Sequence, residues 1–235
     1  MNPSQRALYL EALGIDVWVS RDAPAAVEAR PTPGPRGGAL DDAEFLHSWQ
    51  ALEAEVRTCT KCPLHRSRTQ SVFGVGDPHA QWLVVGEAPG AEEDRQGQPF
   101  VGRAGQLLDS MLRAIGLARG QNVYIANILK SRPPGNRDPK PEEVASCLPY
   151  LRRQIGLIRP VLILAVGRIA AQTLLGSDLA LGRLRGRVHH FGELNTPLVV
   201  TYHPAYLLRT PGDKRKAWED LKFARSVFRD LVTEE

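Results

Sequence analysis

The sequence predicts an α/β protein: a three-layer αβα sandwich on a four-stranded, mostly parallel sheet. Short apolar runs alternate along the chain with longer segments in which apolar residues recur at helical spacing. One run, residues 161–166, is apolar at every position, which is typical of a parallel strand covered on both faces. Such an alternation of strands and helices folds into a parallel sheet with helices on both sides.

The first half of the main domain opens with a charged helix predicted at 41–56 and a first strand at Trp82–Val85. Apolar residues at helical spacing then predict a helix containing Leu107, Leu108, Met111, Leu112 and Ile115. A second strand is expected at 123–129. The next helix begins at Pro141, because proline suits a first turn and the acidic residues after it suit the positive helix end.

The second half continues the alternation. After the third strand at 161–166 we expect a helix, a hairpin, a fourth strand and a final helix, at 168–175, 183–191, 198–201 and 213–231.

The first forty residues differ in composition from the rest. Residues 21–39 hold four prolines, three glycines and five alanines, which predicts a flexible linker over 21–40. Residues 1–20 carry several apolar side chains, so we expect an accessory element that docks on a protein partner. The main domain is expected at 41–235.

Composition limits the class of protein. A chain of 235 residues with 43% hydrophobic residues is long enough for one sizeable core. No basic-then-apolar leader and no run of about 18 apolar residues occurs, so we expect no export signal and no membrane span. Three cysteines, two of them in the pair Cys59-x-x-Cys62, fit a reduced compartment better than a disulfide framework. We therefore expect a cytoplasmic protein, and a monomer.

The charge is unevenly distributed. Residues 1–56 carry four arginines against nine acidic residues, so the remaining 26 basic and 17 acidic residues give the main body a charge of +9. A basic body favours a polyanionic partner such as nucleic acid, although many basic proteins bind none.

Polar side chains follow three predicted strands. Glu87 lies just after the first, Asn127 near the end of the second and His203 after the fourth. Ligands of open α/β sheets bind at the carboxyl ends of the strands, so these side chains should converge on one rim. A carboxylate, an amide and an imidazole together suit orienting water, reading a planar base and stabilising an anion.

Three segments at these strand ends carry a resemblance. They read GEAPGAEEDRQGQPFVGRAGQLLDSML over 86–112, YIANILKSRPPGNRDP over 124–139 and YHPAYLLR over 202–209. In this order and spacing, over roughly 57–230, they resemble the family 4 uracil-DNA glycosylases, the thermostable iron–sulfur kind. The resemblance implies the uracil-DNA glycosylase fold and removal of uracil from single- or double-stranded DNA in base-excision repair, which leaves an abasic site.

The resemblance also implies how the base is bound. Phe100 would stack on a uracil flipped out of the helix. The amide of Asn127 matches the O4 acceptor and the N3–H donor of uracil but not cytosine. The backbone of Ala88 would shape the pocket. Glu93 would exclude the methyl group of thymine, with a solvated acidic cluster at a helix start as the alternative.

Two residues are expected to perform the chemistry. His203 would donate to uracil O2 as negative charge develops there. Glu87 would orient or deprotonate the attacking water. Other uracil glycosylase families carry Asp one step away, so whether Glu87 is a true general base is left open.

The segment 206–209 resembles a wedge that fills the gap left by the flipped base. Within it we expect Tyr206 and Leu207 to contact DNA. The basic residues expected to bind phosphates are Arg132, Arg137, Arg209 and Lys214, although an exposed basic run is more often a solvated face.

Family 4 enzymes carry a [4Fe–4S] cluster on four cysteines. Cys59, Cys62 and Cys147 match three of these positions, and Ser131 replaces the fourth. A serine oxygen is a harder and less acidic donor than a thiolate, so we expect an incompletely ligated, weaker cluster. Ligation by Ser131, a labile three-iron form and no cluster all remain open. Zinc is disfavoured, because Cys-x2-Cys-x2-His65 is tighter than usual zinc spacing.

Two other functions are considered. One is a catalytically silent DNA-binding or damage-sensing protein on the same fold. The other is a nucleotide-binding enzyme that uses GEAPG for phosphates, which is disfavoured because no Gly-x4-Gly-Lys-Ser/Thr or Gly-x-Gly-x2-Gly follows any predicted strand.

Overall fold

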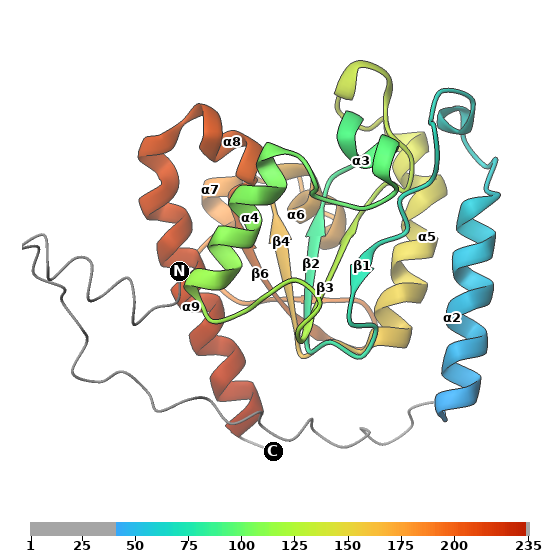
Figure 1. Ribbon diagram of the computed structural model, residues 1–235. Coiled ribbons are helices and arrows are strands. Elements are labelled where there is room, and N and C mark those ends of the chain that lie inside the picture. The colour runs from blue at the N-terminus through green and yellow to red at the C-terminus, as the bar shows by residue number, and fades with distance from the viewer. Residues whose placement is uncertain (1–40, 234–235) are drawn as a thin grey trace, which may run out of the picture. The chain divides into compact units, whose positions relative to one another are not determined.

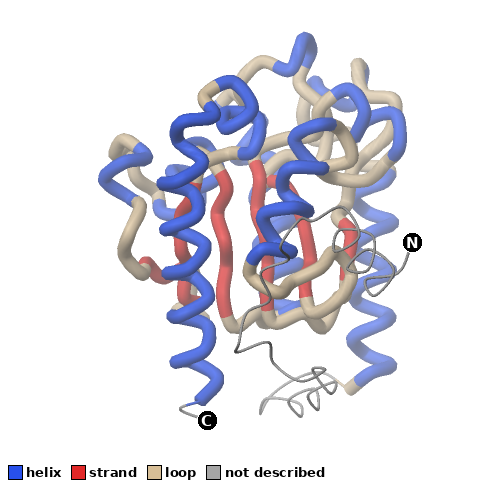
Figure 2. The backbone as a smooth tube through the Cα atoms, turned by 60° about the vertical axis from the view of Figure 1, so that its left-hand side comes forward, coloured by secondary structure: helices blue, strands red, loops and turns tan. Residues whose placement is uncertain are grey.

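The structure is a computed structural model that describes residues 41–233. The accessory element predicted at 1–20 and the linker predicted at 21–40 lie outside the described residues. Figures 1 and 2 show helices on both faces of one central sheet. Among residues 41–233, none of the helices has both the length and the apolar character that a membrane span requires.

The sheet of the described domain has six strands in the order β1-β3-β2-β4-β6-β5. They are β1 (Val75–Gly76), β2 (Trp82–Gly86), β3 (Val123–Asn127), β4 (Leu162–Val166), β5 (His189–Phe191) and β6 (Thr196–Thr201). The four central strands are parallel, which confirms the predicted core, and β1 and β5 add antiparallel edges.

The predicted strand number of four was therefore too low. β1 has two residues, too few to leave a periodic pattern. β5 was missed because the hairpin was expected at 183–191. The hairpin instead joins β5 to β6, and its first predicted residues form a short helix.

The α-helices are α2 (Asp42–Arg57), α3 (Ala91–Gln96), α4 (Arg103–Ala114), α5 (Pro141–Ile158), α6 (Arg168–Leu175), α7 (Leu181–Leu184), α8 (Pro204–Arg209) and α9 (Lys214–Thr233). Short 3-10 helices lie at Pro63–Arg66, Pro134–Asn136 and Pro211–Asp213. The five predicted helices are confirmed within a few residues of their bounds. α3, α7 and α8 span six residues or fewer, too short for a periodic signal.

Alternate residues of the strands face two different helix layers. Leu83 and Val85 pack with α5, α6 and α7, whereas Trp82 and Val84 pack with α4, α8 and α9. α2 lies outside α5, as Figure 1 shows, and packs on it through a small separate cluster. The predicted three-layer sandwich is thus confirmed.

The carboxyl ends of the central strands are level with one another. Gly86 and Asn127, the last residues of β2 and β3, are direct partners in the ladder. Val166 and Thr201, the last residues of β4 and β6, pair in the same way. Residues just beyond these ends therefore meet along one rim of the sheet.

Candidate active site

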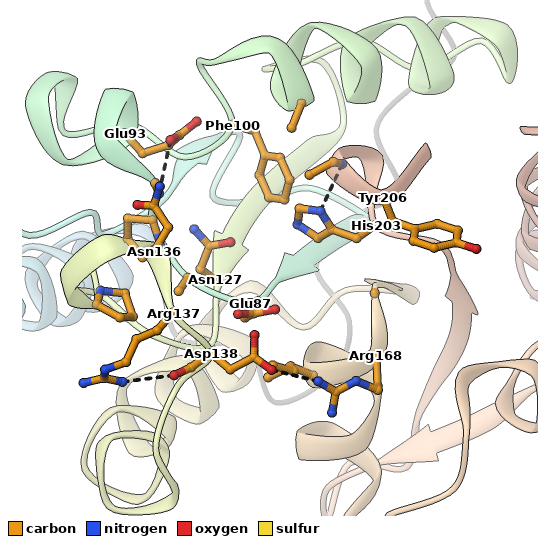
Figure 3. A pocket seen from close by; sticks show the side chains of 18 of the residues that line it. Glu87, Glu93, Phe100, Asn127, Asn136, Arg137, Asp138, Arg168, His203 and Tyr206 are labelled. Atoms are coloured by element: carbon orange, nitrogen blue, oxygen red, sulfur yellow. Dashed lines mark hydrogen bonds and ion pairs between the residues drawn. The ribbon is translucent and has the colours of Figure 1, made fainter. Parts of the chain in front are cut away.

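A cavity of about 690 Å³ lies at this rim. Its lining includes Glu87, Asn127 and His203, each from a different strand end, and Phe100 from the loop before α4. Figure 3 shows these four side chains around one space. The predicted convergence of a carboxylate, an amide and an imidazole is therefore present in the structure.

Gly86, the last residue of β2, lies against two side chains of the cavity lining. A Cβ atom at this position would lie 2.5 Å from Asn127 Oδ1 and 2.5 Å from Phe100 Cζ. Neither contact is sterically possible, so only glycine lets the amide and the aromatic ring approach each other here.

The Asn127 side chain is 2% exposed, and its Oδ1 accepts no hydrogen bond within the described part of the chain. A buried acceptor left without a partner costs about 1–3 kcal/mol. Because Asn127 lines the cavity, a bound molecule with an N–H group can supply the missing donor.

The ring of Phe100 is buried beside His203, with 5.6 Å between ring centroids and 33° between planes. Figure 3 shows this ring projecting into the space between Asn127 and His203. The backbone of Phe100 has a φ of 55°, in the left-handed region. Such a conformation is uncommon for a bulky residue and persists only where the surroundings impose it.

His203 is the N-cap of α8, and its Nδ1 accepts a hydrogen bond of 3.1 Å from the backbone N–H of Ala205. Nδ1 therefore carries no proton, and the ring proton lies on Nε2. Burial, together with the charge of Arg209, lowers the pKa of His203 to about 4, while Glu93 opposes this shift. At neutral pH His203 is an uncharged N–H donor.

Glu87 lies half-buried in the cavity wall. Burial and the negative charge of Asp138 raise its pKa to about 7, and the positive charge of Arg168 opposes this shift. Asp138 and Arg168 form an ion pair at 2.8 Å, marked in Figure 3. The carboxyl group of Glu87 thus exchanges its proton in the range in which a general base works best.

Comparison with known proteins identifies the family. The model of the uracil DNA glycosylase superfamily matches residues 73–222. The type-4 uracil-DNA glycosylase of Archaeoglobus fulgidus is 44% identical over 183 residues, covering 75% of this chain and 92% of the relative. The type-4 enzyme of Pyrobaculum aerophilum is 43% identical, covering 73% and 90%, and that of Thermotoga maritima is 41% identical, covering 77% and 94%. The chain belongs to the type-4 uracil-DNA glycosylases.

This membership confirms the predicted family, fold and enzyme class: the chain is a uracil-DNA glycosylase. The four cavity residues all fall within the matched range. None of these three relatives is described as a silent DNA-binding protein or as a nucleotide-binding enzyme.

In this glycosylase Glu93 is not part of a solvated cluster. Its Oε1 accepts hydrogen bonds from the backbone N–H groups of Val101 and Gly102, at 2.9 and 3.0 Å, and its Oε2 accepts one from Gly90 at 3.1 Å. Glu93 lines the cavity, as does Ala88. Its carboxylate therefore joins the loop after β2 to the loop that carries Phe100.

Leu207 does not lie where the sequence placed it. Its side chain is 1% exposed and packs in the core against the sheet, so the expected contact with DNA is wrong. Leu208 is 37% exposed and is the apolar side chain that α8 presents to solvent. Tyr206 lines the cavity and donates a hydrogen bond to Asp213 at 2.6 Å. Successive residues of a helix face different ways, and in a helix of six residues the sequence could not assign the inward one.

The predicted basic residues form two groups. Arg137 makes a two-bond ion pair with Glu143, at 2.9 and 2.6 Å, and Arg132 donates to Asn136 at 2.7 Å. These three bonds hold the loop after β3. Arg209 and Lys214 are exposed at the end of α8 and the start of α9, and DNA contact by these residues stays a prediction.

Two charged residues of the cavity lining escaped the sequence analysis. Arg168 lies two residues after the end of β4, so the rule on strand ends could have found it. Asp138 lies beyond the end of β3, and its ion pair with Arg168 joins residues 30 positions apart, which leaves no local pattern.

The three cysteines lie in one region. Cys147 is buried on α5, and Cys59 and Cys62 are partly exposed in the segment after α2. Burial raises the pKa of the Cys147 thiol, and Cys62 and Cys59 are near enough to raise it further. Ser131 is buried, and its Oγ accepts a hydrogen bond of 2.8 Å from Arg68.

The described residues thus offer three thiols near one another, and a hydroxyl in place of a fourth. The Ser131 hydroxyl is already bound by the Arg68 guanidinium, which also donates to the carbonyls of Arg57 and Cys59, each at 3.0 Å. Within residues 41–233 no three His, Cys, Asp or Glu side chains are grouped so that they could hold a single metal ion.

Proposed function

We propose that this glycosylase binds a uracil flipped out of DNA in the rim cavity and hydrolyses its N-glycosidic bond, leaving an abasic site for base-excision repair. A stacked base is out of reach of a cavity, so the base must leave the helix first. The observation that carries the proposal is the buried, unpaired Oδ1 of Asn127 beside an aromatic ring and a neutral imidazole.

Asn127 selects the base. Its Oδ1 accepts the N3–H of uracil, and its amide group donates to O4. Cytosine has no proton on N3, so binding it would leave Oδ1 buried and unpaired. Phe100 stacks on the face of the base, and the backbone of Ala88 shapes the wall.

Glu93 contributes to exclusion of thymine through the loop that it holds. Its bonds to the N–H groups of Val101 and Gly102 support this role, because they fix the wall next to Phe100. A fixed wall leaves no room for the additional methyl group.

His203 stabilises the departing base. Cleavage leaves negative charge on uracil, and a preorganised donor aimed at O2 lowers the barrier most where that charge develops. The Ala205 N–H bond to Nδ1 supports this role, because it fixes the Nε2–H tautomer. The lowered pKa of His203 supports donation by a neutral ring.

Glu87 orients the attacking water and accepts its proton. Its pKa of about 7 supports this role, because the carboxylate is basic enough to accept a proton and is largely ionised above neutral pH. The hydroxyl group of one water molecule bonds to the sugar carbon as the N-glycosidic bond breaks, and the proton that Glu87 has accepted passes to the departing uracil, which leaves as the free base.

DNA lies across the mouth of the cavity. Leu208, in place of Leu207, enters the stack where the base has left, since it is the exposed apolar residue of α8. The remaining residues proposed to contact the duplex or single strand are Tyr206, Arg132, Arg137, Arg209 and Lys214. The basic residues would neutralise flanking phosphates.

Cys59, Cys62 and Cys147 would hold an iron–sulfur cluster through three thiolates. Such a cluster would crosslink the segment after α2 to α5, and it would take no part in hydrolysis, because none of the proposed catalytic residues is a ligand. We also propose that the enzyme acts in the cytoplasm as a monomer. A partner for residues 1–20 stays a prediction.

Strand cleavage tests the function. A duplex with one uracil, and a matched duplex with thymine there, are incubated with the protein and then with hot alkali. Breakage at uracil alone is expected, with release of free uracil. Binding to the uracil duplex without base release would instead support the silent DNA-binding alternative.

A further inference from the structure

The loop that carries Phe100 is held by residues outside the cavity. Arg119, in the turn after α4, donates from Nη1 to the carbonyl of Pro99 at 2.9 Å and from Nη2 to that of Phe100 at 2.8 Å. Its Nε and Nη2 also donate to Asp109 Oδ1 on α4, at 3.1 and 3.0 Å. One guanidinium therefore fixes two consecutive carbonyls while a carboxylate orients it.

The other side of the loop is fixed as well. Glu93 accepts the N–H groups of Val101 and Gly102, directly after Phe100. A Cβ atom on Gly105 would lie 1.7 Å from the Phe100 carbonyl oxygen, so the first turn of α4 presses against that same group. Hydrogen bonds to the residue before Phe100, to Phe100 itself and to the two residues after it thus hold its backbone in the left-handed conformation.

We propose that Arg119 is a positioning residue for uracil binding: it holds the Phe100 backbone in the left-handed conformation that points the ring into the cavity. Arg119 does not line the cavity and acts only through Phe100. The inference rests on the proposed stacking role of Phe100. A lysine cannot replace this arginine, because an ammonium group lacks the planar fork that reaches two carbonyls and a carboxylate together.

Loss of Arg119 should weaken binding of the uracil base more than binding of the DNA around it. With the carbonyls of Pro99 and Phe100 released, the loop can relax toward ordinary backbone angles and the ring no longer faces the base. Misplacement of a contact by about 1 Å can cost about 10²-fold in rate. Affinity for DNA that already contains an abasic site should change little, because no base occupies the cavity.

The test compares Arg119→Met, Arg119→Lys, Phe100→Ala and the double variant Arg119→Met/Phe100→Ala. Arg113→Met is the matched control, because Arg113 donates to the backbone carbonyl of Asp109, the residue whose side chain binds Arg119, but makes no bond to this loop. For each protein we would measure kcat/KM on uracil-DNA, inhibition by free uracil and affinity for abasic DNA.

Arg119→Met and Arg119→Lys should lower kcat/KM by about tenfold or more and weaken inhibition by uracil, with abasic-DNA affinity unchanged. The double variant should be no worse than Phe100→Ala alone, because both changes remove the same contact. Arg113→Met should match the wild type. If Arg119→Met does not fold, Asp109→Asn, which leaves the guanidinium without its orienting carboxylate, should give a smaller loss of the same kind.

Three results would overturn the inference. The first is that Phe100→Ala is impaired while Arg119→Met keeps wild-type kinetics, which would show that Arg119 does not position the ring. Where Asp109→Asn replaces Arg119→Met, wild-type kinetics of Asp109→Asn would show the same. Additive losses in the double variant would show that Arg119 acts elsewhere. An unimpaired Phe100→Ala would remove the stacking role itself, and the inference with it.

Discussion

Arg168, at the start of α6, donates to Asp138 at 2.8 Å, and this ion pair lies in the cavity wall that also holds Glu87. The two charges act on the pKa of Glu87 in opposite directions. The pair links the loop after β3 to the segment after β4. Substitution of Asp138 or Arg168 should therefore change the pKa of the proposed general base while Glu87 itself stays in place.

The first prediction is a pH profile governed by Glu87. With a pKa of about 7, Glu87 is protonated in acid, so kcat/KM should fall about tenfold per pH unit below this value and level off above it. His203 stays neutral over this range, because its pKa is about 4. Glu87→Gln should be slow and should lack the acidic limb.

Replacement of the flanking charges should shift this limb in opposite directions. Asp138→Asn removes a negative charge, which eases ionisation of Glu87 and moves the limb to lower pH. Arg168→Gln removes a positive charge and moves it to higher pH. The pH dependence of kcat/KM is measured for both variants. If their acidic limbs move in the same direction, or do not move, the limb belongs to a group other than Glu87.

The second prediction separates recognition from stability at Asn127. Asn127→Ala should lower kcat/KM by about 10²-fold or more, because uracil loses two hydrogen bonds in a buried site. The melting temperature should not fall, because the variant removes an acceptor that is unpaired in the free enzyme. A large fall in melting temperature with little loss of activity would mean that Asn127 is structural.

The third prediction uses two adjacent leucines. Leu207→Ala should lower the free energy of unfolding by about 2–5 kcal/mol, because it leaves a cavity in the core. Leu208→Ala should leave stability unchanged and slow excision from duplex DNA more than from single strands, which have no stack to fill. Denaturant unfolding and kinetics on both substrates measure this, and the reversed pattern would return the wedge to Leu207.

The fourth prediction concerns Ser131. Ser131→Cys supplies a fourth thiol beside three others, so the variant should bind more iron per chain and keep it longer in air than the wild type. Iron and sulfide analysis after purification without air measures this. Equal iron in both proteins would show that position 131 faces no cluster.

Much of this site could be predicted from strand ends. The apolar runs at β2, β3, β4 and β6 arise because both faces of the sheet are covered, and Glu87, Asn127 and His203 follow directly from the rule that ligands bind at carboxyl ends. The sequence could not assign the buried leucine of α8, because a helix of six residues is too short for a periodic pattern. It also could not predict that Arg119 binds the Phe100 loop, because bonds to backbone carbonyls require no particular side chain there.

Uracil release by matched variants tests the central claim most directly. Free uracil is measured over time from a duplex with a single uracil, for the wild type and for Asn127→Ala and His203→Ala. The account predicts rapid release by the wild type, breakage at that site in alkali, and losses of about 10²-fold or more in both variants, with an unchanged melting temperature for Asn127→Ala. Release at the wild-type rate by either variant, or none by the wild type, would contradict it.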